Sequence, residues 1–434
     1  MDNYDFSVSN LGQPVVDSPL HDVTFIDDEL VVYEKDPKKI IEEYNENGTI
    51  SAFSKAGPVK KIFHDPKWTK AAILTAGGLC PGLNDVIKGL TITLKVDYKV
   101  PIVYGIRYGY RGLNPEYGHE PIILDENTVD DIHEFGGTIL GSSRGRQSEE
   151  IMLETLKRMN INVLFCIGGD GTLRCAHDLH KFVKKKGLNI SIVGIPKTID
   201  NDICFIDRTF GFETAVYATN SVITAAHNEA KGAYNGVGLI HVMGRDSGFI
   251  AAYATLANTH VNYCLVPEED FSLYDGERPL FKCLQERLIK RKHAVIIVAE
   301  GAGQYFFKDE HKLDKSGNKL HKNIGLFLKN ELKKWSAEEN FEINIKYFDP
   351  TYNIRSVPAH GTDAVFCQML AQNAVHAAMA GYTDVVIGHW NDSFTNVPIP
   401  LAVHSRKKID INEPLWNSIK AVTWLKNRAS KSKN

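Results

Sequence analysis

Six short runs of mostly apolar residues constrain what this chain can fold into more than any other feature. Each run ends in glycine and polar residues, and helical spacing of apolar residues follows several of them, as at Val86, Leu90 and Leu94. The runs are 71–75, 163–167, 192–195, 237–242, 294–299 and 385–388. Strands that are apolar at every position are typical of parallel sheets covered on both faces. The sequence therefore predicts an α/β fold with two doubly wound, Rossmann-like α/β domains and mainly parallel sheets.

The spacing of these runs divides the chain into four segments. Residues 1–69 are polar and acid-rich, so we expect an N-terminal extension that packs on a core or mediates assembly. Residues 70–212 form a first α/β domain, to which we expect the chain to return at about 360–410. Residues 213–359 form a second α/β domain, and 411–434 a C-terminal segment.

The composition of the chain limits which binding partners and which cellular compartment we expect. The chain has 50 Lys and Arg against 53 Asp and Glu, so its net charge of −3 gives no global attraction to nucleic acid or acidic lipid. Its seven cysteines are scattered and never form CxxC, which argues against disulfides and a zinc site. The sequence shows neither a secretory signal nor an apolar run of ~18 residues. We therefore expect a cytoplasmic protein that binds neither nucleic acid nor a membrane.

Two glycine-rich clusters follow predicted strands. In residues 75–84, Gly77 and Gly78 would let backbone N–H groups approach an anion at a helix N-terminus, although tight turns of this kind are common. In residues 168–172, Asp170 adds a carboxylate among the glycines. A carboxylate beside a phosphate site is reasonable if Mg²⁺ lies between them. The alternative is that Asp170 only caps the next helix.

The cluster at residues 196–202 is the most informative. It places Asp200 and Asp202 just after Lys197 and Thr198. Transfer of a phosphoryl group to a hydroxyl needs a carboxylate that accepts the proton and a cation that balances the developing charge. The alternative is a local Asx turn, which would not require the lysine.

Further cations occur in other clusters. Arg245 follows the predicted strand at 237–242, Arg144 lies in the glycine- and serine-rich segment 141–147, and Arg355 lies near Tyr352. Arginine suits bidentate contacts with phosphate, but each of these could also be a solvated surface residue. The phosphate loop of P-loop enzymes, the protein-kinase signatures and the GxGxxG fingerprint are all missing from the sequence. A phosphoryl-transfer enzyme with this sequence belongs to another class.

Seven of these motifs together resemble one family, the 6-phosphofructokinases, in order and approximate spacing. The motifs are TAGGLCPGLN, GSSRGRQ, GGDGT, PKTIDND, MGRDSG, VAEG and DPTYNIR. The resemblance runs from about residue 70 to about 425 and is strongest to ATP-dependent members of the pyrophosphate-like branch, such as the kinetoplastid enzymes. It implies an allosteric glycolytic enzyme, a homotetramer or homodimer, that uses ATP to phosphorylate the 1-hydroxyl of D-fructose 6-phosphate, giving fructose 1,6-bisphosphate and ADP. The alternatives are a pyrophosphate-dependent phosphofructokinase, a lipid or NAD kinase, and a non-catalytic metabolite-sensing subunit.

The resemblance also implies roles for individual residues. The first α/β domain would bind the nucleotide and the second the sugar phosphate. Asp200 would be the catalytic base, with Lys197 and Thr198 beside it, and Asp170 would be the metal-associated carboxylate. The implied nucleotide contacts are Gly77, Gly78, Arg144, Gly145, Gly169, Asp170, Gly171 and Thr172. The implied sugar-phosphate contacts are Thr198, Ile199, Asp200, Asp202, Met243, Gly244, Arg245, Glu300, Tyr352 and Arg355.

Two positions bear on the phosphoryl donor. In the family, pyrophosphate users resemble GGDD with a lysine in PKTIDND, whereas bacterial ATP users resemble GGDG with PGTIDND. This chain combines Gly171 with Lys197. An aspartate at position 171 would point a carboxylate toward the α-phosphate of ATP, so Gly171 favours ATP, while Lys197 suits either donor. We therefore expect ATP as the donor and Mg²⁺ as the cofactor. A further departure is Arg146, where close relatives resemble GSSRGPQ; it adds a cation near the nucleotide or lies in solvent.

Overall fold

The computed structural model describes residues 4–276, 279–307 and 320–423. These residues form two compact units. The first consists of residues 4–211 and 356–405, and the second of the remaining described residues. Residues 4–69 belong to the first unit, and residues 406–423 to the second.

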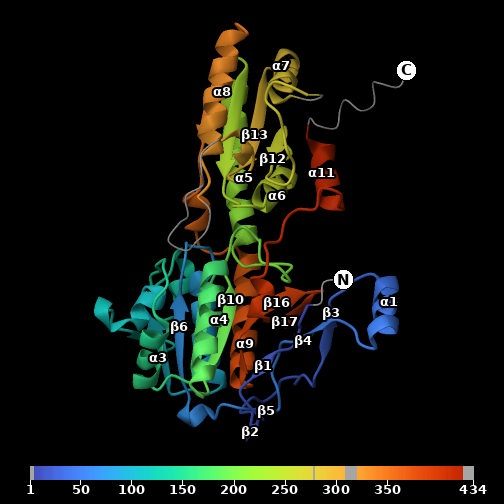
Figure 1. The fold of residues 1–434 in the computed structure, drawn as a ribbon. Helices are drawn as coiled ribbons and strands as arrows, with labels where there is room; N and C mark the ends of the chain where they lie inside the picture. Colours follow the sequence, from blue (N-terminus) through green and yellow to red (C-terminus); the bar gives the residue numbers. More distant parts are fainter. Residues whose placement is uncertain (1–3, 277–278, 308–319, 424–434) are drawn as a thin grey trace. The chain divides into compact units, whose positions relative to one another are not determined.

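A nine-stranded sheet forms the centre of the first unit (Figure 1). Its five neighbouring parallel strands, in sheet order, are β16 (Val385–Trp390), β10 (Ser191–Pro196), β9 (Val163–Gly168), β6 (Lys70–Thr75) and β7 (Ile102–Ile106). Antiparallel strands flank them: β8 (Ile122–Ile123) at one edge, and β17 (Ser393–Pro398), β4 (Ala52–Lys55) and β3 (Leu30–Val32) at the other. All four apolar runs predicted as strands in this unit are therefore strands.

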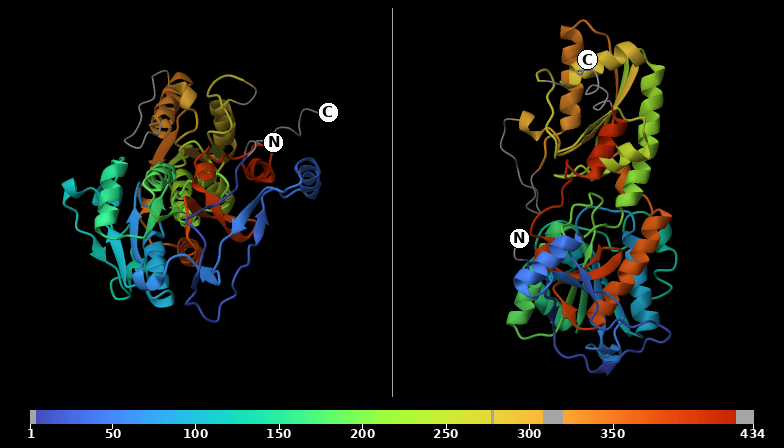
Figure 2. Two further views of the ribbon diagram at one scale, coloured as in Figure 1. Left: turned by 60° about the horizontal axis from the view of Figure 1, so that its bottom comes forward. Right: turned by 90° about the vertical axis from the view of Figure 1, so that its right-hand side faces the viewer.

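Helices cover both faces of this sheet (Figure 2). One pair is α2 (Leu83–Ile92) with α9 (Gly361–Met379), and the other is α3 (Glu149–Arg158) with α4 (Asp170–Lys185). The connection from β6 through α2 leads to β7 on one side, whereas the connection from β9 through α4 leads to β10 on the other. Because such crossovers are right-handed, opposite directions place the two helices on opposite faces. The chain therefore has a topological switch point between β6 and β9.

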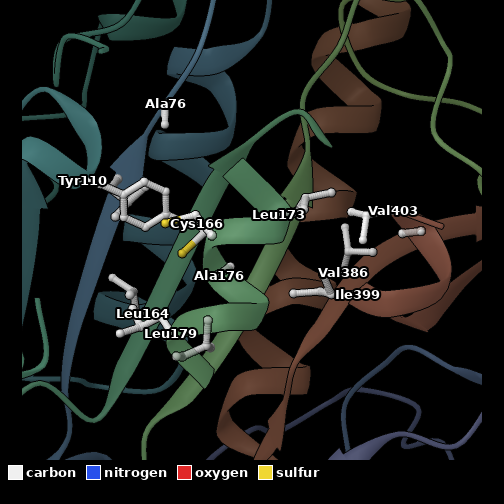
Figure 3. Packing of buried hydrophobic residues seen from close by; sticks show 14 of the residues in the cluster. Ala76, Tyr110, Leu164, Cys166, Leu173, Ala176, Leu179, Val386, Ile399 and Val403 are labelled. Carbon is white, nitrogen blue, oxygen red and sulfur yellow. The ribbon is translucent and has the colours of Figure 1, made fainter. Parts of the chain in front are cut away.

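The core of the first unit lies between α4 and the strands beneath it (Figure 3). Leu173, Ala176 and Leu179 form one face of α4 and belong to a buried cluster with Leu164 and Cys166 of β9. This is the apolar spacing that predicted the helix. Burial of each large side chain contributes roughly 1.5–3 kcal/mol, so the start of α4 is held firmly beside the end of β9. The helix predicted over Val86–Leu94 is also present, although its last turn, Thr93–Asp97, is a π-helix.

Residues before Lys70 contribute more regular structure than their irregular pattern indicates. They contain α1 (Pro37–Asn47) and short strands, of which β3 and β4 extend the large sheet beside β17. The other short strands are β1 (Ser9–Asn10), paired with β15 (Tyr382–Thr383), and β2 (Val16–Asp17), paired with β5 (Lys61–Ile62). Phe53 of β4 is fully buried against Trp390. Strands of two to four residues are too short to show a period of their own.

The second unit has a four-stranded, entirely parallel sheet. Its order is β12 (Tyr263–Leu265), β13 (His293–Ala299), β11 (Gly236–Val242) and β14 (Asn344–Phe348). Its helices are α5 (Phe212–Gly232), α6 (Phe249–Ala257), α7 (Leu280–Arg291), α8 (Ile324–Glu338) and α11 (Pro414–Val422). The predicted α/β class is confirmed in both units. No helix in the described parts of the chain is long and apolar enough to cross a membrane.

Candidate active site

The predicted phosphate clusters lie at the switch point of the first sheet. Thr75, at the end of β6, pairs with Ile167, one residue before the end of β9. The turns that follow these two strands lead to helices on opposite faces, which is the point of the carboxyl edge where open α/β sheets bind ligands. The fold therefore brings residues 76–82 and 168–172 to the one edge where ligands bind in such sheets.

A third segment, residues 141–147, joins them; we call it the GSSRGRQ loop. The Gly77 N–H donates to the Ser143 carbonyl at 3.0 Å, and the Ser142 hydroxyl donates to the Gly77 carbonyl at 2.7 Å. The Thr75 hydroxyl donates to the Gly141 carbonyl at 2.7 Å. These bonds bring together Gly77, Gly78, Arg144 and Gly145, all of them nucleotide contacts in the sequence-based hypothesis.

Arg146 does not lie free in solvent. Its Nη1 is 2.9 Å from Oδ2 of Asp178, in the third turn of α4. Both side chains are partly exposed, so the pair is worth at most about 1 kcal/mol. It links the GSSRGRQ loop to α4.

Asp170 is the first residue of α4 rather than its cap. Gly169 occupies the N-cap position, and no side chain caps this end. Asp170 instead lies 3.2 Å from Nε of Arg174, one turn further along α4. A Cβ on Gly168 would come within 2.2 Å of the Thr172 hydroxyl, so only glycine fits there. The helix start therefore presents backbone N–H groups and one carboxylate, and the alternative that Asp170 merely caps the helix is wrong.

This arrangement suits Mg²⁺ better than a metal held by the protein alone. The described residues contain no group of three or more His, Cys, Asp or Glu side chains that could hold a metal ion. Mg²⁺ commonly takes one or two carboxylates and completes its shell with substrate phosphates and water. A single, partly exposed Asp170 carboxylate beside uncapped backbone N–H groups at the helix start fits that pattern.

Lys197 connects the two glycine clusters. Its backbone N–H donates to the Gly168 carbonyl at 3.0 Å, and its ammonium donates to the Gly78 carbonyl at 2.7 Å. A Cβ on Gly77 would lie 3.5 Å from Nζ. The side chain is 6% exposed, so its charge is only weakly screened by water.

The segment after Lys197 holds two buried aspartates. The Asp200 N–H donates to the Thr198 hydroxyl at 3.0 Å, and that hydroxyl donates to Oδ1 of Asp202 at 3.1 Å. Asn201 has a left-handed φ of 52°, and its side-chain oxygen accepts from the Thr209 N–H at 3.1 Å. Local hydrogen bonds of the kind expected for a turn are thus present, and they involve the side chains of Thr198, Asn201 and Asp202. Ile199 is buried, so a ligand would meet its backbone.

The predicted sugar-phosphate residues of the second unit follow the carboxyl ends of its parallel strands. Arg245, three residues after β11, has a left-handed φ of 47°, and its N–H donates to Oε1 of Glu300 at 2.8 Å. A Cβ on Gly301 would lie 1.9 Å from the Arg245 carbonyl. Glu300 therefore fixes the backbone of residues 243–248, which we call the MGRDSG loop and which includes Met243 and Gly244.

Tyr352 and Arg355 lie beyond the end of β14. The Arg355 guanidinium carbon is 4.7 Å from the centroid of the Tyr352 ring, in cation–π geometry. The Tyr352 side chain is 70% exposed. This pair follows the strand next to β11 in the same sheet.

Glu268, which belongs to no sequence motif, contacts the MGRDSG loop. Its Oε1 accepts hydrogen bonds from the Gly248 N–H at 2.9 Å and from the Ile409 N–H at 3.0 Å. The Ser247 hydroxyl also donates to the carbonyl of Lys407. Burial raises the pKa of the Glu268 carboxyl, although the hydrogen bonds from Ile409 and Gly248 act to lower it. Glu268 thus ties the end of the MGRDSG loop to residues 406–409, and only its place after β12 could have pointed to it.

Comparison with known proteins identifies the family of this chain. A sequence model of the phosphofructokinase family matches residues 70–378. The chain belongs to the phosphofructokinase family. Two similar relatives are both named ATP-dependent 6-phosphofructokinase. The protein of Borreliella burgdorferi is 44% identical over 434 residues, 97% of each chain. That of Entamoeba histolytica is 46% identical over 370 residues, 85% of this chain and 84% of the relative.

Solved phosphofructokinases share the fold. A pyrophosphate-dependent phosphofructokinase from Marinobacter aquaeolei matches with a TM-score of 0.66, over 82% of this chain and 91% of its own. Its sequence identity is 21%, so this likeness concerns the fold alone.

Proposed function

We propose that this protein is an ATP-dependent 6-phosphofructokinase, which transfers the γ-phosphoryl group of ATP to the 1-hydroxyl of D-fructose 6-phosphate. The products are fructose 1,6-bisphosphate and ADP. The observation that carries the proposal is the position of Lys197, whose ammonium bonds to Gly78 and whose chain leads directly into Thr198 and Asp200. Relatives named ATP-dependent 6-phosphofructokinase, at 44% and 46% identity, support it.

The first unit would bind the nucleotide and carry out the transfer. Backbone N–H groups at the start of α4, from Gly169 to Thr172, would receive phosphate oxygens, together with Gly77, Gly78, Arg144 and Gly145. Lys197 would balance the negative charge that develops on the transferred group, because its ammonium is buried and already held in place.

Asp200 would act as the general base. The 1-hydroxyl oxygen of the sugar attacks the γ-phosphorus, the bond from that phosphorus to the β,γ-bridging oxygen breaks, and ADP leaves. The hydroxyl proton passes to the Asp200 carboxylate. Thr198 and Asp202 orient this residue, since the Thr198 hydroxyl accepts from the Asp200 N–H and donates to Asp202.

The second unit would bind the phosphate of fructose 6-phosphate. Arg245 and Arg355 supply guanidinium groups, which bind phosphate with two hydrogen bonds each when aligned. Glu300 accepts a hydrogen bond from the Arg245 N–H, and it would also accept one from a sugar hydroxyl. Met243, Gly244 and Tyr352 complete the proposed contact set.

Asp170 would hold Mg²⁺, which would neutralise charge on the donor phosphates when bound. The Asp170 carboxylate, whose Oδ1 is 3.2 Å from Nε of Arg174, would leave that arginine when it binds Mg²⁺. We further propose that the protein acts in the cytoplasm as a homodimer or homotetramer, on the basis of family resemblance.

The proposed enzyme differs from a pyrophosphate-dependent phosphofructokinase in its phosphoryl donor. A substitution at position 171 tests which donor it uses. An aspartate in place of Gly171 would lie near the α-phosphate, and two charges ~4 Å apart repel by about 4 kcal/mol at an effective dielectric of ~20. The assay supplies fructose 6-phosphate and Mg²⁺ with either ATP or pyrophosphate. We expect the wild type to use ATP, Gly171→Asp to lose more than tenfold of that turnover, and Gly171→Ala to keep most of it. A wild type that prefers pyrophosphate would overturn the proposal.

A further inference from the structure

Two further residues that belong to no sequence motif contact the predicted sugar-phosphate residues of the second unit. They are Gln304, in the 3₁₀ turn that follows β13, and His321, which lies just before α8. Both belong to the same unit as Arg245 and Glu300. Their hydrogen bonds form a closed ring through these two residues, and the proposed reaction gives neither Gln304 nor His321 a role.

The ring surrounds an unfavourable backbone conformation at Arg245. Its φ of 47° lies in the left-handed region, where a residue with a side chain is strained. Such a conformation persists only where neighbouring contacts fix it. Oε1 of Glu300 holds the Arg245 N–H at 2.8 Å, which fixes the amino side of the residue. A contact on its carboxyl side would complete the hold.

His321 supplies that contact through the next residue along the chain. Its Nε2 lies 3.1 Å from Oδ1 of Asp246. This hydrogen bond and, to a lesser extent, the charges of Arg406 and Lys408 hold the pKa of Asp246 down to about 2. The carboxylate is therefore ionised and can only accept, so Nε2 of His321 donates a charge-assisted bond.

Gln304 fixes the place of His321. Its side-chain oxygen accepts from the Lys322 N–H at 3.1 Å, and its Nε2 donates to the Lys322 carbonyl at 2.9 Å. The same Nε2 also donates to the Glu300 carbonyl at 2.7 Å. The backbone next to His321 is thus bound to the residue whose carboxylate holds Arg245, and this contact closes the ring.

The ring also offsets a negative charge. Asp246 directly follows Arg245, the proposed contact for the phosphate of the sugar, and its side chain is 39% exposed. A carboxylate near a phosphate dianion weakens binding unless a donor or a cation compensates it. His321 compensates it by donating to Oδ1. Loss of His321 would therefore release one side of Arg245 and leave Asp246 without this donor.

We propose that His321 is a positioning residue for the sugar-phosphate site. Its bond to Asp246, together with the bond from the Arg245 N–H to Glu300, keeps Arg245 in the left-handed conformation and so sets the direction of the guanidinium. Gln304 acts through His321 and Glu300, and neither Gln304 nor His321 touches the substrate. The inference rests on the proposed function, because fructose 6-phosphate is the ligand whose binding responds.

Steady-state kinetics of the full-length protein with fructose 6-phosphate, ATP and Mg²⁺ test the effect on the substrate. His321→Ala should raise the KM for fructose 6-phosphate by about 5–30-fold, with kcat changed less than about threefold and the KM for ATP unchanged. Asn323→Ala is the control, since the Asn323 side chain caps α8 at the Leu326 N–H and does not belong to the ring. It should lower the melting temperature and leave the KM for fructose 6-phosphate unchanged.

A double-mutant cycle tests whether His321 acts through Asp246. In a protein that already carries Asp246→Ala, His321→Ala should raise the KM for fructose 6-phosphate by less than about twofold. Gln304→Ala breaks the ring at another point and should raise the same KM, which gives a second test should His321→Ala fold poorly.

Amide hydrogen exchange tests the hold on the loop without any substrate. The MGRDSG loop contains the Arg245 N–H, and in His321→Ala this loop should exchange at least about threefold faster than in the wild type or in Asn323→Ala.

Three results would overturn the inference. The exchange of the MGRDSG loop could be the same in His321→Ala and the wild type, the KM for fructose 6-phosphate could rise as much in Asn323→Ala as in His321→Ala, or the effect of His321→Ala could persist in full beside Asp246→Ala. A wild type that does not phosphorylate fructose 6-phosphate would instead contradict the proposed function. The exchange rates would still decide whether His321 holds the loop.

Discussion

The Lys197 ammonium donates a hydrogen bond to the main-chain carbonyl of Gly78 over 2.7 Å, although 119 positions separate the two residues in sequence. This contact joins the segment after β10 to the turn after β6, with β9 between them in the sheet. It holds a buried cation where backbone carbonyls and N–H groups meet. A donor phosphate that replaced the Gly78 carbonyl as its partner would find the ammonium already in position.

Replacement of Lys197 should therefore slow the chemical step. We expect Lys197→Met to lower kcat by about 10²–10³-fold, the usual effect of removing one group that stabilises transition-state charge. Lys185→Met, at the exposed end of α4, is the matched control and should leave kcat within twofold. Steady-state kinetics with fructose 6-phosphate, ATP and Mg²⁺ decides the matter, and equal kcat values for the two variants would remove Lys197 from the role.

Asp200 and Asp202 lie in one loop but should differ in effect. Asp200→Asn removes the proposed base and should lower kcat by roughly 10²–10⁴-fold with a smaller change in the KM for fructose 6-phosphate. Asp202→Asn keeps an oxygen that can accept from the Thr198 hydroxyl, so its loss should be at least tenfold smaller. Near-normal turnover in folded Asp200→Asn would contradict the assignment.

Arg245 should act on the sugar phosphate rather than on the nucleotide. Loss of a charge-assisted contact to a dianion costs roughly 1.5–3 kcal/mol, which corresponds to about 10–150-fold in the KM for fructose 6-phosphate. The KM for ATP should barely change in Arg245→Ala. A larger change for ATP than for the sugar would show that this arginine belongs to the donor site.

Glu268 should position Arg245 without touching the substrate. In Glu268→Gln, one amide oxygen must replace an anion that accepts from both Gly248 and Ile409, so the MGRDSG loop is less firmly held. We expect the KM for fructose 6-phosphate to rise about 3–30-fold while kcat changes less than threefold. Glu269→Gln alters the neighbouring carboxylate, which pairs with Lys420, and serves as control. An equal fall in kcat and stability with an unchanged KM would indicate a purely structural role.

The sequence could predict those strands whose pattern lies in consecutive residues. β6, β9, β10, β11, β13 and β16 are apolar along most of their length, because both faces of each are covered. β14 (Asn344–Phe348) was not predicted as a strand, because its side chains are exposed or only half-buried and two of them, Asn344 and Lys346, are polar. The role of Glu268 could not be predicted for another reason. Its partners are backbone N–H groups 20 and 141 positions away, and every residue type except proline has such a group, so the sequence does not show which ones Glu268 contacts.

Most motif residues, by contrast, could be predicted because they follow the buried strands β6, β9, β10, β11 and β13, and ligands bind beyond the carboxyl ends of parallel strands. Residues 141–147 follow no strand, so their place at this edge shows only in hydrogen bonds such as that from the Gly77 N–H to the Ser143 carbonyl.

Buried histidines should make the first unit sensitive to acid. Burial lowers the pKa of His64, His180 and His376 to about 4, whereas an unfolded histidine titrates near 6.5. Between these values the unfolded chain binds more protons than the folded one, so stability falls as the pH drops from 6.5 toward 4. At pH 5 each histidine costs about 2 kcal/mol relative to neutral pH.

Carboxyls act in the opposite direction, because burial raises the pKa of Asp85, Asp97 and Asp384. Burial raises the pKa of Asp384 to about 6, so the folded state holds that proton more tightly and gains stability as the pH falls below 6. Of these carboxyls Asp384 has the largest shift, and it is smaller than that of each histidine, so the three histidines leave a net loss. Urea unfolding followed from pH 7.5 to 5 should show a falling free energy of unfolding, and His64→Gln should remove about a third of the histidine contribution. His404→Gln, at an exposed position, should leave the slope unchanged. A free energy that stays constant over this range, or equal slopes for wild type and His64→Gln, would contradict the assignment of these histidines as neutral in the folded protein.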